Sequence, residues 1–162
     1  MREVLSRVIV PVPIEVAWEV FLDFESWGMR KKIYDKLDWL NGRPWQQHSR
    51  ARLRQLWPDP QIVLIRVLQS HPPDLLSALY HANGVTSTKN VRFRAMDAHT
   101  TEVQIQTECL GESLDSATAS ADVTLKKIYD LTLEDYSMEC RTRSLRLPHH
   151  DSSSAGQHGK LA

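Results

Sequence analysis

Apolar residues change their spacing early in the chain. Residues 8–13, V-I-V-P-V-P, form a β-branched run that the two prolines end, because proline donates no ladder hydrogen bond. The following apolar residues recur at helical spacing, at Ile14, Ala17, Trp18, Phe21 and Leu22. We therefore expect a strand over residues 1–10, a short helix that ends near Asp23, and a second short helical turn over residues 29–35.

The middle of the chain alternates polar and apolar residues. Asn-Gly pairs and proline clusters interrupt this alternation and predict turns. The runs between them predict strands over residues 36–40, 50–57, 61–70, 75–82, 87–96 and 100–110. Regular alternation indicates one face against the core and one face in solvent.

Helical spacing returns after Gly111. Apolar residues then step by three or four positions to Tyr136, which predicts one long amphipathic helix that ends near Arg143. From Pro148 onward, polar and small residues dominate and no apolar period remains. We therefore expect one domain over residues 1–145 and a disordered polar tail over 146–162.

Composition and charge narrow the classes of function. The 20 basic residues balance the 20 acidic ones, so no overall charge draws the chain to nucleic acid or to anionic lipid. Neither a signal peptide nor a membrane-spanning apolar run is apparent, and only two cysteines, Cys109 and Cys140, are present. These features predict a cytoplasmic protein with free thiols and no stable membrane insertion.

Several segments resemble the START-like (SRPBCC, helix-grip) superfamily of polyketide cyclases/dehydrases and lipid-transport proteins. The opening strand, proline pair and short Trp-containing helix resemble the start of these domains. Residues 39–45, W-L-N-G-R-P-W, resemble a hairpin of some bacterial members, although His48 stands where glycine is expected. The later strands of these domains are resembled by the segments around Pro72-Pro73, Asn83-Gly84-Val85, Phe93 and residues 100–103.

The element order and the resemblance together predict an α+β helix-grip fold. In it, a curved antiparallel sheet of six to seven strands wraps around the long C-terminal helix, with two short helices after the first strand. A sheet of this size twists and curls, so one helix leaves space beside its dry face. We expect this space to hold an apolar pocket.

The strand and helix faces that point toward this space supply the candidate ligand contacts. The expected ligand-binding residues are Leu53, Gln55, Trp57, Val63, Ile65, Ala78, Tyr80, Phe93, Ile105, Thr107, Leu125, Ile128, Tyr129 and Thr132. Polar groups on a dry face need partners, and a ligand can be one of them.

The sequence supports three hypotheses of function. The first is a protein that encloses a hydrophobic ligand, such as a lipid, an isoprenoid or a polyketide-like ring system, without metal or cofactor. The second is an enzyme of the polyketide cyclase/dehydratase type, in which Tyr80, His81 or Tyr129 acts as acid or base. The third is an interaction module that docks a protein through Arg50, Arg52 and Arg54 on one strand face.

Overall fold

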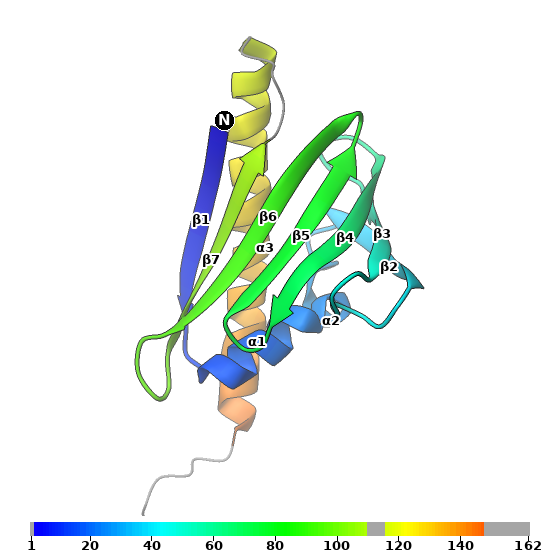
Figure 1. Ribbon diagram of the computed structural model, residues 1–162. Coiled ribbons are helices and arrows are strands. Elements are labelled where there is room, and N and C mark those ends of the chain that lie inside the picture. Colours follow the sequence, from blue (N-terminus) through cyan, green and yellow to red (C-terminus); the bar gives the residue numbers. More distant parts are fainter. Residues whose placement is uncertain (1, 110–115, 148–162) are drawn as a thin grey trace, which may run out of the picture.

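A computed structural model describes residues 2–109 and 116–147, with side chains described for 3–108 and 123–147 (Figure 1). Its elements are β1 (Arg2–Val10), α1 (Ile14–Leu22), α2 (Phe24–Trp27), β2 (Tyr34–Asn41), β3 (Arg50–Gln55), β4 (Gln61–His71), β5 (Leu75–Ala82), β6 (Val85–Ala95), β7 (Thr101–Cys109) and α3 (Ser116–Arg146). The predicted order of strand, short helices, strands and long helix is confirmed.

The strands of the described residues form one seven-stranded antiparallel sheet in the order β1-β7-β6-β5-β4-β3-β2. Neighbours along the chain pair as hairpins from β2 to β7, and β1 closes the order by pairing with β7. The long helix α3 crosses one face of this sheet and packs along β1 (Figure 1). The architecture is the α+β helix-grip arrangement that the sequence predicts.

The alternation of each strand decides which side chains face α3. In β7, Val103, Ile105 and Thr107 are fully buried, whereas Gln104 and Gln106 between them are half-buried on the outer face. The same alternation holds in β3 and β4, whose burial patterns change at every residue along most of their length. The inner face is therefore apolar, with a small number of polar side chains among its members.

Aromatic packing closes one end of the space between the sheet and α3. The rings of Phe21, Trp27 and Tyr136 lie with their centroids 5.3 to 5.8 Å apart in tilted or edge-to-face geometry. The Tyr136 hydroxyl donates a hydrogen bond of 2.7 Å to the carbonyl oxygen of Ala17, which ties α3 to α1. Phe93 of β6 packs against the same cluster. These contacts leave this end solid.

The second short helix lies earlier than the sequence predicts. Residues 29–33 form turns, and the helix is α2 at Phe24–Trp27. Asp23 adopts a non-helical conformation, with φ −85° and ψ 45°, so it ends α1 and α2 starts directly after it. Trp27 is fully buried, and its indole N–H donates to the carbonyl oxygen of Val20 at 2.7 Å. Burial of Trp27 therefore decides where the second helix forms.

Smaller differences concern the ends of the elements. The strand predicted over 50–57 ends at Gln55, and α3 continues to Arg146. The predicted start of the final helix, directly after Gly111, and nearly all of the predicted tail lie outside the described residues. None of the helices in the described ranges has the length and apolar character that crossing a bilayer requires.

Candidate functional site

The inner face brings most of the predicted ligand contacts together. Leu53, Gln55, Val63, Ile65, Ala78, Phe93, Ile105, Thr107, Ile128, Tyr129 and Thr132 are buried, and Tyr80 and Leu125 are half-buried. Phe93 differs from the others because its ring packs 5.2 Å from Trp18 of α1, in the closed end. Whether any of these residues contacts a ligand remains a prediction.

Four side chains form a polar cluster within this apolar surface. We call Tyr80, Lys89, Thr107 and Tyr129 the inner polar cluster; they come from β5, β6, β7 and α3. Lys89 pairs with Thr107 in the register of β6 and β7. The hydroxyl groups of Thr107 and Tyr129 share a hydrogen bond of 2.5 Å. The cluster thus links the sheet to the helix that covers it.

The Lys89 ammonium lies between two aromatic rings. Its Nζ is 4.9 Å from the ring centroid of Tyr80 and 4.9 Å from that of Tyr129. Both distances are within the range of a cation–π interaction. Burial lowers the pKa of Lys89 to about 8 and raises the pKa of the Tyr80 hydroxyl above its ordinary value. A fraction of Lys89 is therefore neutral near neutral pH.

A second pair of polar groups lies deeper along the helix. Burial raises the pKa of Tyr34 to about 12, although a hydrogen bond with Thr132 opposes this shift. The Thr132 hydroxyl also donates to the carbonyl oxygen of Ile128 at 2.7 Å, within α3. Thr132 therefore has partners inside the protein, so the polar group predicted as a ligand contact is already satisfied.

Solvent reaches the inner face at the end opposite α1 and α2. Tyr80, Ala82 and Lys89 point inward from β5 and β6 but are only half-buried, and so is Leu125 on the facing part of α3. Side chains that point into the interior and keep accessible surface require open space beside them. The β5–β6 turn lies far from α1 and α2, which close the other end (Figure 1). The inner surface is thus partly accessible to solvent at this end and closed by aromatic packing at the other.

Trp57 lies at the rim of this open end. It follows β3, keeps 37% of its surface exposed, and carries the Nζ of Lys127 5.6 Å from its ring centroid. Gln55, two residues earlier, is buried on the inner face. The predicted inward face of β3 therefore continues to its last residue, Gln55. Trp57 lies beyond the strand and borders the opening together with α3.

His81 faces away from the inner polar cluster. It is exposed on the outer face of β5, where its Nδ1 lies 2.8 Å from the hydroxyl oxygen of Thr86. The side chain of Tyr80 next to it points inward, as the strand period requires. The sequence hypothesis needed a register shift to bring His81 to the pocket, and the β4–β5 and β5–β6 registers contain none at this position.

The predicted arginine face is largely neutralised by neighbouring carboxylates. Arg54 forms two hydrogen bonds with Asp35, one of them from its Nε at 2.6 Å. Arg52 lies 3.4 Å from Asp38. Both acidic residues come from β2, the adjacent edge strand. This pairing weakens the case for Arg52 and Arg54 as a free docking surface.

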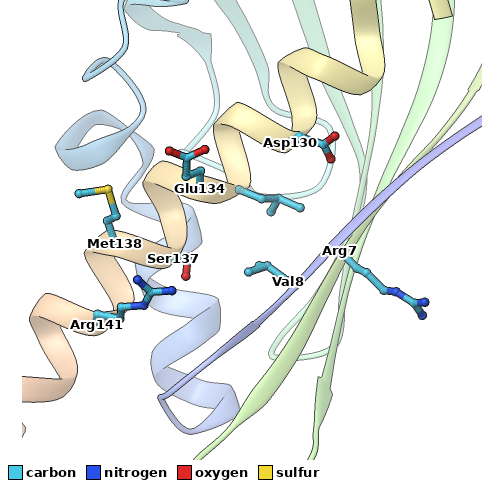
Figure 2. A pocket seen from close by; sticks show the side chains of 8 residues that line it. Arg7, Val8, Asp130, Glu134, Ser137, Met138 and Arg141 are labelled. Carbon is cyan, nitrogen blue, oxygen red and sulfur yellow. The ribbon is translucent and has the colours of Figure 1, made fainter. Parts of the chain in front are cut away.

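A groove lies at one edge of the sheet, between the edge strand β1 and α3 (Figure 2). It has a volume of about 330 Å³ and is lined by Arg7, Val8, Asp130, Leu133, Glu134, Ser137, Met138 and Arg141. Its charged groups are two bases and two acids, so it has no net charge preference. The inner polar cluster does not line this groove.

Lys89 is the residue of the cluster that sequence reasoning missed. Its signal was present, because Lys89 precedes the inward residues Val91 and Phe93 by two and four positions. A strand places residues at this spacing on one face. The predicted ligand contacts are apolar or uncharged side chains, so they do not include a lysine at an inward position.

This geometry is the helix-grip fold that the sequence predicts. Among solved structures, the chain is similar to the Zhui aromatase/cyclase of a Streptomyces species, with 15% identity, a TM-score of 0.67, and coverage of 90% of this chain and 94% of the other. No family model and no curated protein sequence matches the chain.

Two further structures share the arrangement. Ara h 8.0201 has 10% identity and a TM-score of 0.63, with coverage of 87% of this chain and 98% of the other. The di-domain ARO/CYC StfQ from the steffimycin biosynthetic pathway has 15% identity and a TM-score of 0.66, with coverage of 88% and 46%. At these identities the similarity establishes the fold.

Proposed function

We propose that the protein binds a hydrophobic small molecule between the inner face of the sheet and α3. The observation that carries this proposal is the half-buried inner surface at one end of an otherwise closed interior. Ligand sites are commonly concave and apolar with a few convergent polar groups, and the inner polar cluster matches this description. The similarity in fold to a solved aromatase/cyclase supports the same proposal.

The test uses a neutral fluorescent dye, N-phenyl-1-naphthylamine, whose emission rises in apolar surroundings. The wild-type protein should bind it saturably, with one dye per chain. Leu125→Trp would fill the opening from α3 and should weaken binding at least tenfold. Val123→Trp introduces the same side chain on the same helix at a position that is 71% exposed, and should leave binding unchanged.

The comparison is valid when both variants have the melting temperature of the wild type, measured by circular dichroism. Binding that is absent in the wild type would rule out the proposed function. Equal dye affinity in Leu125→Trp and Val123→Trp would show that the dye does not occupy the space beside Leu125.

A cyclase/dehydratase activity is a second candidate, favoured by the chemistry of Lys89. An amine with a pKa of about 8 is about one-tenth neutral at pH 7 and can accept a proton from a carbon between two carbonyl groups. The Tyr129 hydroxyl, in the same cluster, would lie beside the developing enolate oxygen. Incubation with a linear poly-β-ketone thioester tests this, because Tyr129→Phe and Lys89→Met should each change the cyclised products. Product profiles that match the protein-free control would exclude catalysis of this type.

A further inference from the structure

Lys89 is the charged residue of the inner face. Among the described side chains, the inward positions of the other strands carry apolar, hydroxyl or amide groups, such as Ser6, Gln55 and Thr107. The acidic residues of β7, Glu102 and Glu108, lie on the outer face. The half-buried Lys89 therefore points inward with no carboxylate partner among the residues that the structure describes.

Such a lysine is costly unless something else binds it. Removing an ammonium from water is unfavourable, and buried charges in proteins are normally paired. The two tyrosine rings offset part of this cost, because their faces attract a cation. The rings do not supply a negative charge. A ligand with an acidic group would supply it.

The surroundings of Lys89 define the rest of such a ligand. Ala78 of β5, which pairs with Lys89 in the register of β5 and β6, is buried. Val91 and Ile105, the next residues along the inner face, are buried too. These side chains offer an apolar wall. The hydroxyl groups of Tyr80 and Tyr129 belong to the same cluster and can donate hydrogen bonds to an acid group.

Resting on the proposed function, we infer that the ligand is an amphipathic acid whose carboxylate binds Lys89 while its hydrocarbon part fills the apolar interior. A carboxylate between the ammonium and the tyrosine hydroxyls forms charge-assisted hydrogen bonds, which are shorter and stronger than neutral ones. A neutral ligand of the same shape leaves the ammonium unpaired and binds more weakly.

The experiment compares 11-(dansylamino)undecanoic acid with its methyl ester, at pH 7, by dansyl fluorescence. Wild type should bind the acid at least tenfold more tightly than the ester. Lys89→Met keeps a side chain of similar length without the charge and should bind both probes equally. Lys36→Met, at a lysine of β2 whose side chain is 61% exposed, is the matched control and should keep the wild-type preference.

A second measurement uses the wild-type protein alone and so does not depend on the folding of Lys89→Met. In protein with ¹³C-labelled lysine, the acid should raise the pKa of one lysine by about one unit or more, and the ester should not. Among the described side chains, the groups that face Lys89 are Tyr80 from β5, Thr107 from β7 and Tyr129 from α3, and none of these three is a carboxylate.

Equal affinity of wild type for acid and ester would overturn the inference and leave the proposed function standing. The same holds for a tight acid complex that survives Lys89→Met, or for a lysine titration that the acid does not shift. Failure of both probes and of the neutral dye to bind would overturn the inference and the proposed function together.

Discussion

The hydroxyl groups of Thr107 and Tyr129 lie 2.5 Å apart in the interior and join β7 to α3. Tyr129→Phe removes this hydrogen bond and leaves the Thr107 hydroxyl buried. We expect it to lower the free energy of unfolding by about 1 kcal/mol, the usual contribution of one hydrogen bond. Urea unfolding measures this change.

A double-mutant cycle with Thr107→Val isolates the pair, because Tyr129 has further contacts. The coupling energy should be about 1 kcal/mol. If the losses of unfolding free energy in the two single variants add up to the loss in the double variant, the two hydroxyls do not stabilise one another.

Lys89 predicts a stability that rises with pH. Its folded pKa of about 8 lies below the value of an unfolded lysine, near 10.4, so between these values the unfolded chain holds the extra proton. The penalty of the buried charge is complete below pH 8 and is lost as the pH rises toward 10.4. Lys89→Met should therefore be more stable than wild type at pH 7, by a margin that narrows by up to about 1.4 kcal/mol per pH unit above 8.

The measurement is urea unfolding of both proteins at pH 7 and pH 9.5. Tyr34 and Tyr80 also have shifted pKa values, but they are present in both proteins and cancel in the difference. Lys127→Met removes an exposed lysine that also lies over an aromatic ring, and it should show no such narrowing. A constant margin for Lys89→Met would mean that Lys89 titrates like a solvated lysine.

Arg143 connects the end of α1 to α3. Its Nη2 lies 2.6 Å from Asp23 and its Nε 2.9 Å from Glu139. Burial alone would raise the pKa of the Glu139 carboxyl, but hydrogen bonds from Arg143 and Arg30 lower it below its ordinary value. Arg143→Met should cost about 1–3 kcal/mol at pH 7, the range for a buried polar group that loses a partner.

The stability that the Arg143 ion pairs contribute should decrease as the pH falls. Carboxylates with lowered pKa values stabilise the fold above their ordinary pKa and lose that effect as the pH falls through the folded value. The difference between Arg143→Met and wild type should therefore shrink between pH 5 and pH 3 in thermal melts. Arg141→Met, at an exposed position on the same helix, is the control and should change the melting temperature little at any of these pH values.

Gly42 and Gly84 offer a matched pair of turn glycines. Both have positive φ, +74° and +76°, which disfavours any side chain. A Cβ at Gly42 would meet the Ser49 hydroxyl at 2.4 Å, whereas a Cβ at Gly84 would meet nothing within 4 Å. The Ser49 hydroxyl cannot easily move, because it donates to the carbonyl oxygen of Arg43 at 2.6 Å.

We therefore expect Gly84→Ala to cost about 1–2 kcal/mol, from backbone strain alone. Gly42→Ala should cost at least about 1 kcal/mol more, because the overlap adds to the same strain. Chemical denaturation of the two variants checks this order. Equal losses would show that the 41–49 hairpin relaxes around the new methyl group.

The sequence predicts the strands well because their period is short and their faces differ. Val103, Ile105 and Thr107 are buried as the alternation indicates. The second helix was misplaced because Asp23 interrupts the helical spacing, while the burial of Trp27 depends on α3, far along the chain. The open end of the interior depends on how α3 lies over the sheet, which no local pattern encodes.

The pairing of β1 with β7 has a consequence for biosynthesis. Arg2 lies opposite Cys109 and Val10 opposite Thr101, so β1, which is synthesised before the other strands of this sheet, must wait for the last of them, β7, before it can pair. Contacts between such distant segments slow folding, and an unpaired apolar strand is prone to aggregation while it waits. The hairpins from β2 to β7 can form during this delay, and a nascent chain that stops before residue 101 would leave β1 available to chaperones.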